Sequence, residues 1–186
     1  KKVACIVATM GTTDAFGLDD LQAIHEIRDD LAHKFGLDYL PHIHADAVIG
    51  WAWSVFNDYN FDENPLGFRR RTVHALAGTT RRIKHLSLAD SIGIDFHKTG
   101  YAPYLSSLFL AKEASDLSRI SRDENATPYL FQSGHYHPGK YTLETSRSAA
   151  GPMAALGSLR LLGKEGLRAL LGHVVSMAEN LREHLH

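Results

Sequence analysis

The chain has 186 residues, 44% of them hydrophobic, which is enough for one domain with a buried core. Its 20 Lys and Arg residues against 21 Asp and Glu leave a formal net charge of −1, without the basic excess typical of proteins that bind nucleic acid or anionic membranes. A single cysteine, Cys5, excludes an internal disulfide framework and favours a reducing, cytoplasmic location. No apolar run approaches the ~18 residues of a transmembrane helix, so we expect no membrane span.

The first predicted elements are a strand and a helix. Residues 3–9 form a β-branched run typical of a buried parallel strand. A helix is predicted from about 21 to 35, beginning after a cap at Asp19 or Asp20 and ending at Gly36. Four apolar residues at helical spacing are expected on its buried face: Leu21, Ile24, Ile27 and Leu31.

A second strand is predicted over residues 39–47, with Asp46 near its C-terminal end. The order strand, helix, strand indicates a right-handed crossover in a parallel sheet. The sequence therefore predicts an α/β fold with a mostly parallel sheet and flanking helices.

The middle of the chain is more varied. Residues 51–68 are aromatic and rich in turn formers, and predict an excursion from the sheet. A basic helix follows over 69–85, whose arginines are interpreted as a solvated face in preference to an anion site. Residues 87–95 and 106–110 are predicted as two further strands, forming an antiparallel pair.

The last third combines a loop with helices. Residues 116–140 are polar and carry several Gly and Pro residues, so they predict a long loop of the kind that often serves as a functional lid. Two helices are predicted over 148–162 and 164–185, separated by Gly163.

Lys98 is the main candidate for chemistry. It follows the apolar run that ends at Asp95 and precedes a turn at Gly100, which indicates a lysine held at the end of a strand. Asp46 ends a different predicted strand, so both side chains are expected at one edge of the sheet. A lysine that forms an imine and an acid that keeps a ring nitrogen protonated are what pyridoxal 5'-phosphate (PLP) requires.

Five segments, in the same order, resemble the PLP-dependent amino-acid decarboxylases, the group that includes the aromatic-amino-acid, glutamate and tyrosine decarboxylases. These segments are residues 8–21, with Gly11-Thr12-Thr13; His44-Ala45-Asp46-Ala47; residues 91–107, with His97-Lys98; Tyr141 to Arg147; and Gly163-Lys164-Glu165-Gly166. The resemblance spans nearly the whole chain.

The resemblance implies a role for each matching residue. Lys98 would form the internal aldimine with PLP, and Asp46 would pair with the pyridine nitrogen. Thr13 would approach the phenolic side of the ring. His97 would help to hold the phosphate, and His44 would support the surroundings of the cofactor.

The implied reaction is the α-decarboxylation of an L-amino acid to the amine and carbon dioxide, through an aldimine on Lys98. Tyr136, in the predicted lid, is a candidate acid for protonating the substrate carbon. The family also implies a homodimer whose active sites lie at the subunit interface.

The fold implied by the resemblance is the aspartate-aminotransferase-like fold of PLP-dependent transferases. Residues 1–147 would form part of its PLP-binding large domain, and 148–186 would be helices that lead toward a C-terminal small domain. Because the chain opens directly in a predicted strand, we expect a fragment of a larger protein, inactive alone.

Two positions depart from the family pattern. Val48 stands where the family usually has a small alanine beneath the ring. Asp95 falls where some members have an asparagine near the phosphate, and a carboxylate there would repel that group. Residues 51–85 form a longer stretch than in the aromatic-amino-acid members and have no implied role.

Alternative interpretations remain open. The segment from His97 to Pro103 is also similar to carbon-carbon lyases of the sphingosine-phosphate type, and a non-catalytic homologue that serves only in dimer assembly is a further alternative. His44 is alternatively a core histidine, Asp46 a structural cap, and Arg147 either an anion ligand or part of a buried ion pair. Although the chain has 12 histidines, no cysteine cluster or His-Glu-x-x-His pattern accompanies them, so no metal site is expected.

Overall fold

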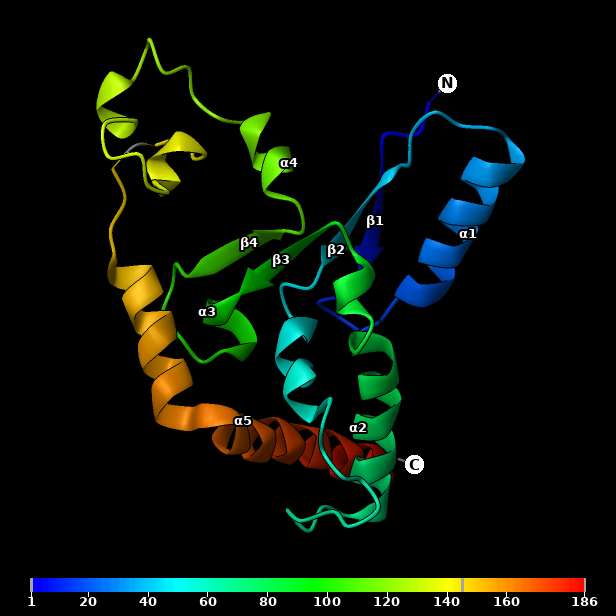
Figure 1. The fold of residues 1–186 in the computed structure, drawn as a ribbon. Helices are drawn as coiled ribbons and strands as arrows, with labels where there is room; N and C mark the ends of the chain where they lie inside the picture. The colour runs from blue at the N-terminus through cyan, green and yellow to red at the C-terminus, as the bar shows by residue number, and fades with distance from the viewer. Residues whose placement is uncertain (1, 145, 186) are drawn as a thin grey trace.

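The computed structural model describes residues 2–144 and 146–185 (Figure 1). Its sheet has the order β1 (Cys5–Thr9), β2 (His42–Asp46), β3 (Ser91–Asp95) and β4 (Ser107–Ala111). The first three strands run parallel, and β4 pairs antiparallel with β3. This arrangement confirms the predicted α/β class and the predicted antiparallel pair, although β2 and β3 are shorter than expected.

Helix α1 (Leu21–Lys34) connects β1 to β2. The Oδ1 atom of Asp20 caps it by accepting a hydrogen bond from the backbone N of Ala23 at 3.2 Å. Gly36 follows the helix with φ +56°, a conformation that suits glycine. The predicted cap at Asp20 and the predicted end of the helix are therefore confirmed.

The predicted buried face of α1 was partly wrong. Leu21 is buried, but Ile27 and Leu31 are 57% and 45% exposed. Arg28 is buried instead, because its Nη1 atom donates a 3.0 Å hydrogen bond to Oδ2 of Asp90, just before β3. The face of the helix that carries Arg28 is therefore turned toward β3, and part of its apolar stripe faces outward.

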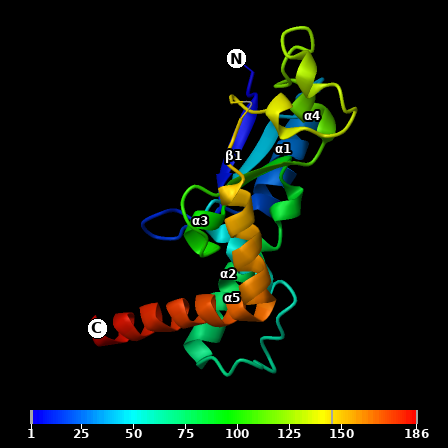
Figure 2. The same ribbon diagram turned by 90° about the vertical axis from the view of Figure 1, so that its left-hand side faces the viewer.

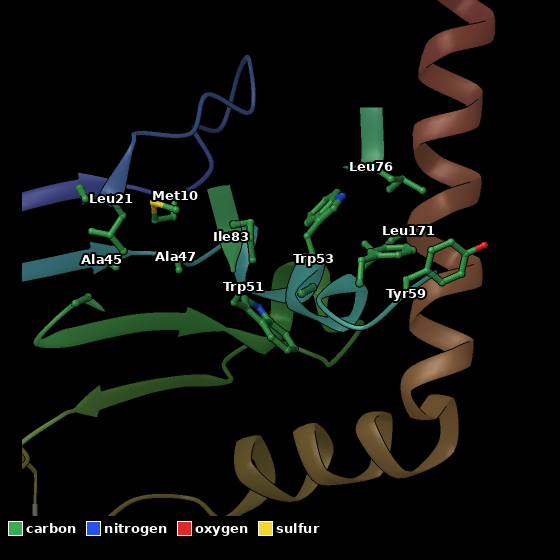
Figure 3. Packing of buried hydrophobic residues seen from close by; sticks show 14 of the residues in the cluster. Met10, Leu21, Ala45, Ala47, Trp51, Trp53, Tyr59, Leu76, Ile83 and Leu171 are labelled. Carbon is green, nitrogen blue, oxygen red and sulfur yellow. The ribbon is translucent and has the colours of Figure 1, made fainter. Parts of the chain in front are cut away.

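The segment that follows β2 is part of the core. A 3₁₀ helix, η1 (Gly50–Phe56), buries Trp51, Trp53 and Phe56. It packs against α2 (Arg70–Ile83) and against the last helix, and Figure 3 shows the two tryptophans between the sheet and Leu171. The predicted excursion from the sheet therefore begins with a helix whose side chains form part of the hydrophobic core.

Helix α5 (Ala150–Leu185) has two limbs that run in different directions (Figures 1 and 2). Gly163 separates them with φ 59° and ψ −172°, outside the helical region. The two predicted helices and the break at Gly163 are confirmed. Arg71 and Glu183 form an ion pair between α2 and the second limb, consistent with the solvated face predicted for the arginines of α2.

Short elements complete the chain. They are η2 (Leu86–Leu88), α3 (Phe96–Thr99), α4 (Ala114–Ser118), η3 (Pro128–Leu130) and η4 (Pro138–Lys140). The predicted loop over 116–140 is thus interrupted by single helical turns. Within the described ranges, no helix has the length and apolar character needed to cross a membrane.

The two faces of the sheet differ in chemistry. Ala8, Ile43 and Ala45 point to one face and belong to the hydrophobic core with Leu21 of α1. Side chains alternate along each strand, so the residues between these core positions on β2, and the residues of β3 that are opposite them, point to the other face. We call this opposite face the polar face, defined by His42, His44, Asp46, Ser91, Gly93 and Asp95.

Candidate active site

Lys98 lies one helical turn beyond the end of β3. The strand ends at Asp95, and α3 begins at the next residue and carries Lys98. Thr99 ties this turn to the chain after β2 by donating a 2.7 Å hydrogen bond from Oγ1 to the carbonyl oxygen of Ile49. The predicted position at a strand end is therefore correct to within one turn.

Trp51 fixes the junction between β3 and α3. Its Nε1 atom donates a 3.0 Å hydrogen bond to the carbonyl oxygen of Asp95, and its ring meets Phe96 edge to face with centroids 5.0 Å apart. A Cβ atom at Gly100 would lie 2.7 Å from the oxygen of Phe96 and 2.9 Å from Trp51, so only glycine fits there. The lysine turn is held tightly against η1.

His97 is packed into the same turn. Its side chain is 6% exposed, and its ring lies against Tyr104 with centroids 4.0 Å apart. The Nδ1 atom lies 3.2 Å from the backbone N of Ser106 and 2.9 Å from the carbonyl oxygen of that residue. These contacts fix the ring and leave Nε2 directed at Asp95, 3.5 Å from its Oδ2.

Asp95 is the residue that joins the site together. Its Oδ2 atom lies 2.9 Å from Nζ of Lys98, and its Oδ1 atom accepts a 2.6 Å hydrogen bond from Ser107 of β4. Burial acts to raise the pKa of Asp95, but the hydrogen bonds from Ser107 and Lys98 and the charges of Lys98 and His97 outweigh it. The pKa of this carboxyl lies below its ordinary value of 3.8, so Asp95 is ionised at neutral pH.

His44 lies on the polar face beside β3. Its Nδ1 atom is 2.8 Å from Oγ of Ser91, and the same hydroxyl is 2.8 Å from Nε2 of His42. The His44 ring also stacks on Phe109 of β4, with centroids 5.9 Å apart. Ser91 therefore fixes two imidazoles from the centre of the face.

Asp46 is directly opposite Gly93 in the register of β2 and β3. Its carboxylate is half-buried and accepts a long hydrogen bond of 3.5 Å from the backbone N of Val48. Gly93 has no side chain, and a Cβ atom there would come within 3.6 Å of His44 Nε2 and 3.7 Å of Val48. The polar face therefore carries no side chain at Gly93, and we call this position, between His44 and Val48, the hollow at Gly93.

Thr13 and Tyr136 are less closely connected to Lys98. Thr13 is exposed in the turn after β1, which Thr12 closes by accepting a 2.7 Å hydrogen bond from the backbone N of Gly17. Tyr136 is 74% exposed and stacks on Tyr141. Its segment lies beside α4 and not beside α3 in both views of the ribbon (Figures 1 and 2). The structure therefore brings Asp95, His97 and Lys98 together, with His44 and Asp46 on the same face, and leaves Tyr136 apart.

Other candidates are structural. Arg147 forms an exposed 2.9 Å ion pair with Glu144 in place of the buried pair considered for it, and Thr145 lies outside the described residues. Across residues 2–144 and 146–185, no group of three or more His, Cys, Asp or Glu side chains is placed to hold a metal ion.

Several residues of the site carry no sequence signal of their own. Trp51 lies in a stretch without an assigned role, and Ser91, Gly93 and Ser107 are small residues in predicted strands. The pairing register is the signal that could have identified the two strand residues, because it sets Gly93 opposite Asp46 and Ser107 opposite Asp95.

No protein-family model matches the chain. Curated relatives named as tyrosine, aspartate and diaminobutyrate decarboxylases match along most of it. L-tyrosine decarboxylase of Enterococcus faecium is 29% identical over 195 residues, covering 97% of this chain and 31% of that protein. The chain thus spans about a third of the length of this relative.

Solved structures share the fold. A crystal structure of mouse CSAD superimposes with a TM-score of 0.61 at 22% identity, covering 97% of this chain and 32% of that one. Sphingosine-1-phosphate lyase of Burkholderia pseudomallei superimposes with a TM-score of 0.55 at 22% identity, covering 88% and 31%. The chain is thus similar in sequence to amino-acid decarboxylases, of which it spans about a third in the E. faecium relative, and it shares its fold with these two solved structures.

Proposed function

We propose that this chain forms part of the PLP-binding large domain of an enzyme that decarboxylates an L-amino acid to the amine and carbon dioxide. The observation that carries the proposal is the placement of Lys98. The lysine sits on a turn locked by Trp51 and Thr99, at the C-terminal end of β3. That edge of a parallel sheet is where α/β folds commonly bind ligands.

The residues on the polar face fit a flat, anionic aldehyde such as PLP. Gly93 carries no side chain between His44 and Val48, so the ring is proposed to lie over this glycine. Asp46 is opposite Gly93 in the strand register, on the same face of the sheet. Val48 lies beside this position and would be a neighbour of the ring.

When bound, PLP supplies an electron sink for the bond that breaks at the amino-acid substrate. Lys98 would hold the cofactor by its aldehyde carbon and later carry a proton. Asp46 would keep the ring nitrogen protonated, because a carboxylate beside a pyridinium stabilises its positive charge. By resemblance, His97 would contribute to holding the phosphate, which requires Nε2 to turn from Asp95, 3.5 Å away in this structure.

Thr13 belongs to the proposal by resemblance, and Tyr136 belongs to it by its position in the predicted lid. Thr13 follows the C-terminal end of β1, the strand next to β2, so the approach of its turn to the ring is compatible with the strand order. Tyr136 as the acid that protonates the substrate carbon requires its loop to move, or requires the loop of a second copy. We therefore propose a cytoplasmic homodimer in which the loop that carries Tyr136 reaches the neighbouring site.

The division at residue 147 is also proposed. Residues 1–147 hold the sheet and the lysine turn, and the long α5 that follows leaves the sheet in a new direction after Gly163. We propose that 148–186 connects the large domain to a small domain.

A carbon-carbon lyase is the second candidate, because sphingosine-1-phosphate lyase of B. pseudomallei shares this fold. The two activities are separated by assaying the full-length protein, loaded with PLP, with a panel of L-amino acids and with a phosphorylated amino alcohol. Release of carbon dioxide from an amino acid supports decarboxylation. Cleavage of the amino alcohol alone supports the lyase, and no turnover of either supports the non-catalytic alternative.

A further inference from the structure

Asp95 is the one part of the lysine turn that the proposed function does not explain. Its side chain is 14% exposed, whereas that of Lys98 is 33% exposed, so the carboxylate is the more enclosed partner of the pair. Its two oxygens have separate partners, because Oδ2 faces Lys98 at 2.9 Å and Oδ1 accepts the hydrogen bond of Ser107 at 2.6 Å. Ser107 therefore orients the carboxylate toward the lysine.

Asp95 is the group of opposite charge next to Lys98, with Oδ2 2.9 Å from Nζ. His97 is a second titratable neighbour of this carboxylate, with Nε2 3.5 Å from Oδ2, and Tyr104 packs on the His97 ring. Asp46 adds a second carboxylate on the same face of the sheet. An opposite charge at this distance attracts the ammonium group, so Asp95 holds the Lys98 side chain at the end of β3.

We propose that Asp95 is a positioning residue that restrains Lys98 before the cofactor binds. It holds the lysine side chain at the sheet edge as an ammonium ion, and the ion pair must open before the lysine reacts with an aldehyde. This inference deepens the proposed function and rests on it for the identity of the aldehyde. It also accounts for a carboxylate at a position where it would repel the phosphate of PLP.

The reaction that the ion pair delays is imine formation between Lys98 and the aldehyde, which needs no further reactant. The ammonium of Lys98 first loses one proton to water. Its lone pair then attacks the aldehyde carbon, a carbon-nitrogen double bond forms, and the aldehyde oxygen leaves as water. Asp95 is a poor acceptor for the proton because its pKa lies below 3.8, so it acts on the reaction as an electrostatic restraint and not as a base.

Competitive labelling tests the restraint on the cofactor-free, full-length protein. Lysines are acetylated with a trace of acetic anhydride, which reacts with the neutral amine, and each lysine peptide is quantified by mass spectrometry over a range of pH. Asp95→Asn should raise the labelling of Lys98 at neutral pH by about tenfold, because it removes the opposite charge that lies 2.9 Å from Nζ. Unchanged labelling of Lys98 would overturn the proposal.

Two control variants separate charge from local loosening. Asp58→Asn removes the carboxylate that lies 2.5 Å from Nζ of Lys164, and it should leave Lys98 labelling unchanged. Trp51→Phe loosens the lysine turn without altering its charge, because it removes the hydrogen bond to the Asp95 carbonyl and part of the ring that packs against Phe96. If Trp51→Phe raised Lys98 labelling as much as Asp95→Asn does, the effect would come from mobility and the proposal would fail.

A second measurement separates the role of Asp95 from the binding of PLP to Lys98. A separate sample of the unaltered protein is incubated with PLP and reduced with borohydride, and the mass of the Lys98 peptide is measured by mass spectrometry. An added pyridoxyl mass together with unchanged labelling in Asp95→Asn rejects the role of Asp95 alone. Absence of the pyridoxyl mass rejects the proposed function, whereas raised labelling in Asp95→Asn would still support the restraint on Lys98.

Discussion

The indole nitrogen of Trp51 donates a 3.0 Å hydrogen bond to the carbonyl oxygen of Asp95 and so joins η1 to the end of β3. Two segments more than forty residues apart in sequence meet at this contact, directly beside the turn that carries Lys98. The stretch after β2, which has no implied role in the sequence, is therefore part of what holds the lysine in place.

Trp51→Phe should destabilise the protein by about 0.5–1.5 kcal/mol more than Trp53→Phe, because only Trp51 loses a hydrogen bond. Trp53 is the matched control: it lies in the same 3₁₀ helix, and its buried Nε1 atom has no hydrogen-bond partner among the residues that the structure describes. Urea unfolding of both variants measures the difference. An equal loss in the two would show that the Trp51 hydrogen bond adds nothing to stability.

Gly93→Ala should weaken PLP binding by about tenfold or more while changing the free energy of unfolding little. The added methyl group meets His44 Nε2 and Val48 at ordinary contact distances of 3.6 and 3.7 Å, but it occupies the hollow proposed for the ring. A steric cost of ~1–3 kcal/mol between the methyl group and the PLP ring corresponds to the expected loss of affinity. Titration with PLP, followed by absorbance, measures it.

Gly100→Ala is the contrasting control for that experiment. Its methyl group would lie 2.7 Å from the backbone oxygen of Phe96 and 2.9 Å from the ring of Trp51, so the turn must shift. We expect a loss of about 1–3 kcal/mol in the free energy of unfolding, the usual cost of overpacking. If Gly93→Ala destabilised the fold as much as Gly100→Ala, the hollow at Gly93 would not be a ligand site.

Ser91→Ala should destabilise the protein by about 1–3 kcal/mol, because the buried hydroxyl is the hydrogen-bond partner of both His42 and His44. Ser118→Ala, which removes an exposed hydroxyl bonded to the carbonyl of Ser115, should have an effect within about 0.5 kcal/mol of zero. Chemical denaturation of the two variants checks the difference. A loss no greater in Ser91→Ala than in Ser118→Ala would contradict the role of Ser91 in fixing the two rings.

The contribution of Asp95 to stability should depend on pH. Because its pKa in the folded protein is below the ordinary value of 3.8, ionised Asp95 stabilises the folded state, and this contribution is complete above pH 3.8. It is lost as the pH falls through the lower pKa of the folded state. The free energy of unfolding should therefore favour the unaltered protein over Asp95→Asn at neutral pH, and this advantage should shrink under acid.

Denaturant titrations of both proteins at neutral and acidic pH measure that advantage. Asp38→Asn serves as the control, because it removes an exposed carboxylate that lies 4.0 Å from Nζ of Lys2. An advantage that is the same at both pH values would contradict the ionised pair between Asp95 and Lys98.

Local sequence patterns predicted most of the fold. The β-branched run before Gly11, the cap at Asp20 and the break at Gly163 each place an element without reference to the rest of the chain, and each is confirmed. The orientation of α1 was not predictable in this way. Arg28 is buried by Asp90, a residue 62 positions away, and helical periodicity contains no information about such a partner.

The candidate site divides along the same line. Lys98, His97, Asp46 and His44 were predicted from motifs, and the structure places them on the polar face and at its edge. Asp95 was the residue without a role, because sequence alone suggested only its repulsion of a phosphate. Its pairing with Lys98 depends on the turn of α3 and on Ser107 across the β3–β4 register, which are tertiary features.

Tyr136 shows the limit of predicting a residue's role from the composition of its loop. Its place in a polar loop suggested a lid, but the described loop lies beside α4 and is tied there by Arg122, which donates hydrogen bonds to the carbonyl oxygens of Gly139 and Thr142. Whether the tyrosine acts on the substrate depends on contacts outside this conformation, and its role stays a prediction.

A covalent bond between PLP and Lys98 can be detected directly by reduction and mass spectrometry. The full-length protein is incubated with PLP, reduced with borohydride and digested, and the masses of the lysine peptides are measured by mass spectrometry. The account predicts a pyridoxyl mass on Lys98, its absence in Lys98→Ala, and a loss of decarboxylation in that variant by about 10²–10⁴-fold or more, the range for a residue that moves protons in the reaction. A pyridoxyl mass on another lysine, or none on Lys98 at saturating PLP, would contradict it.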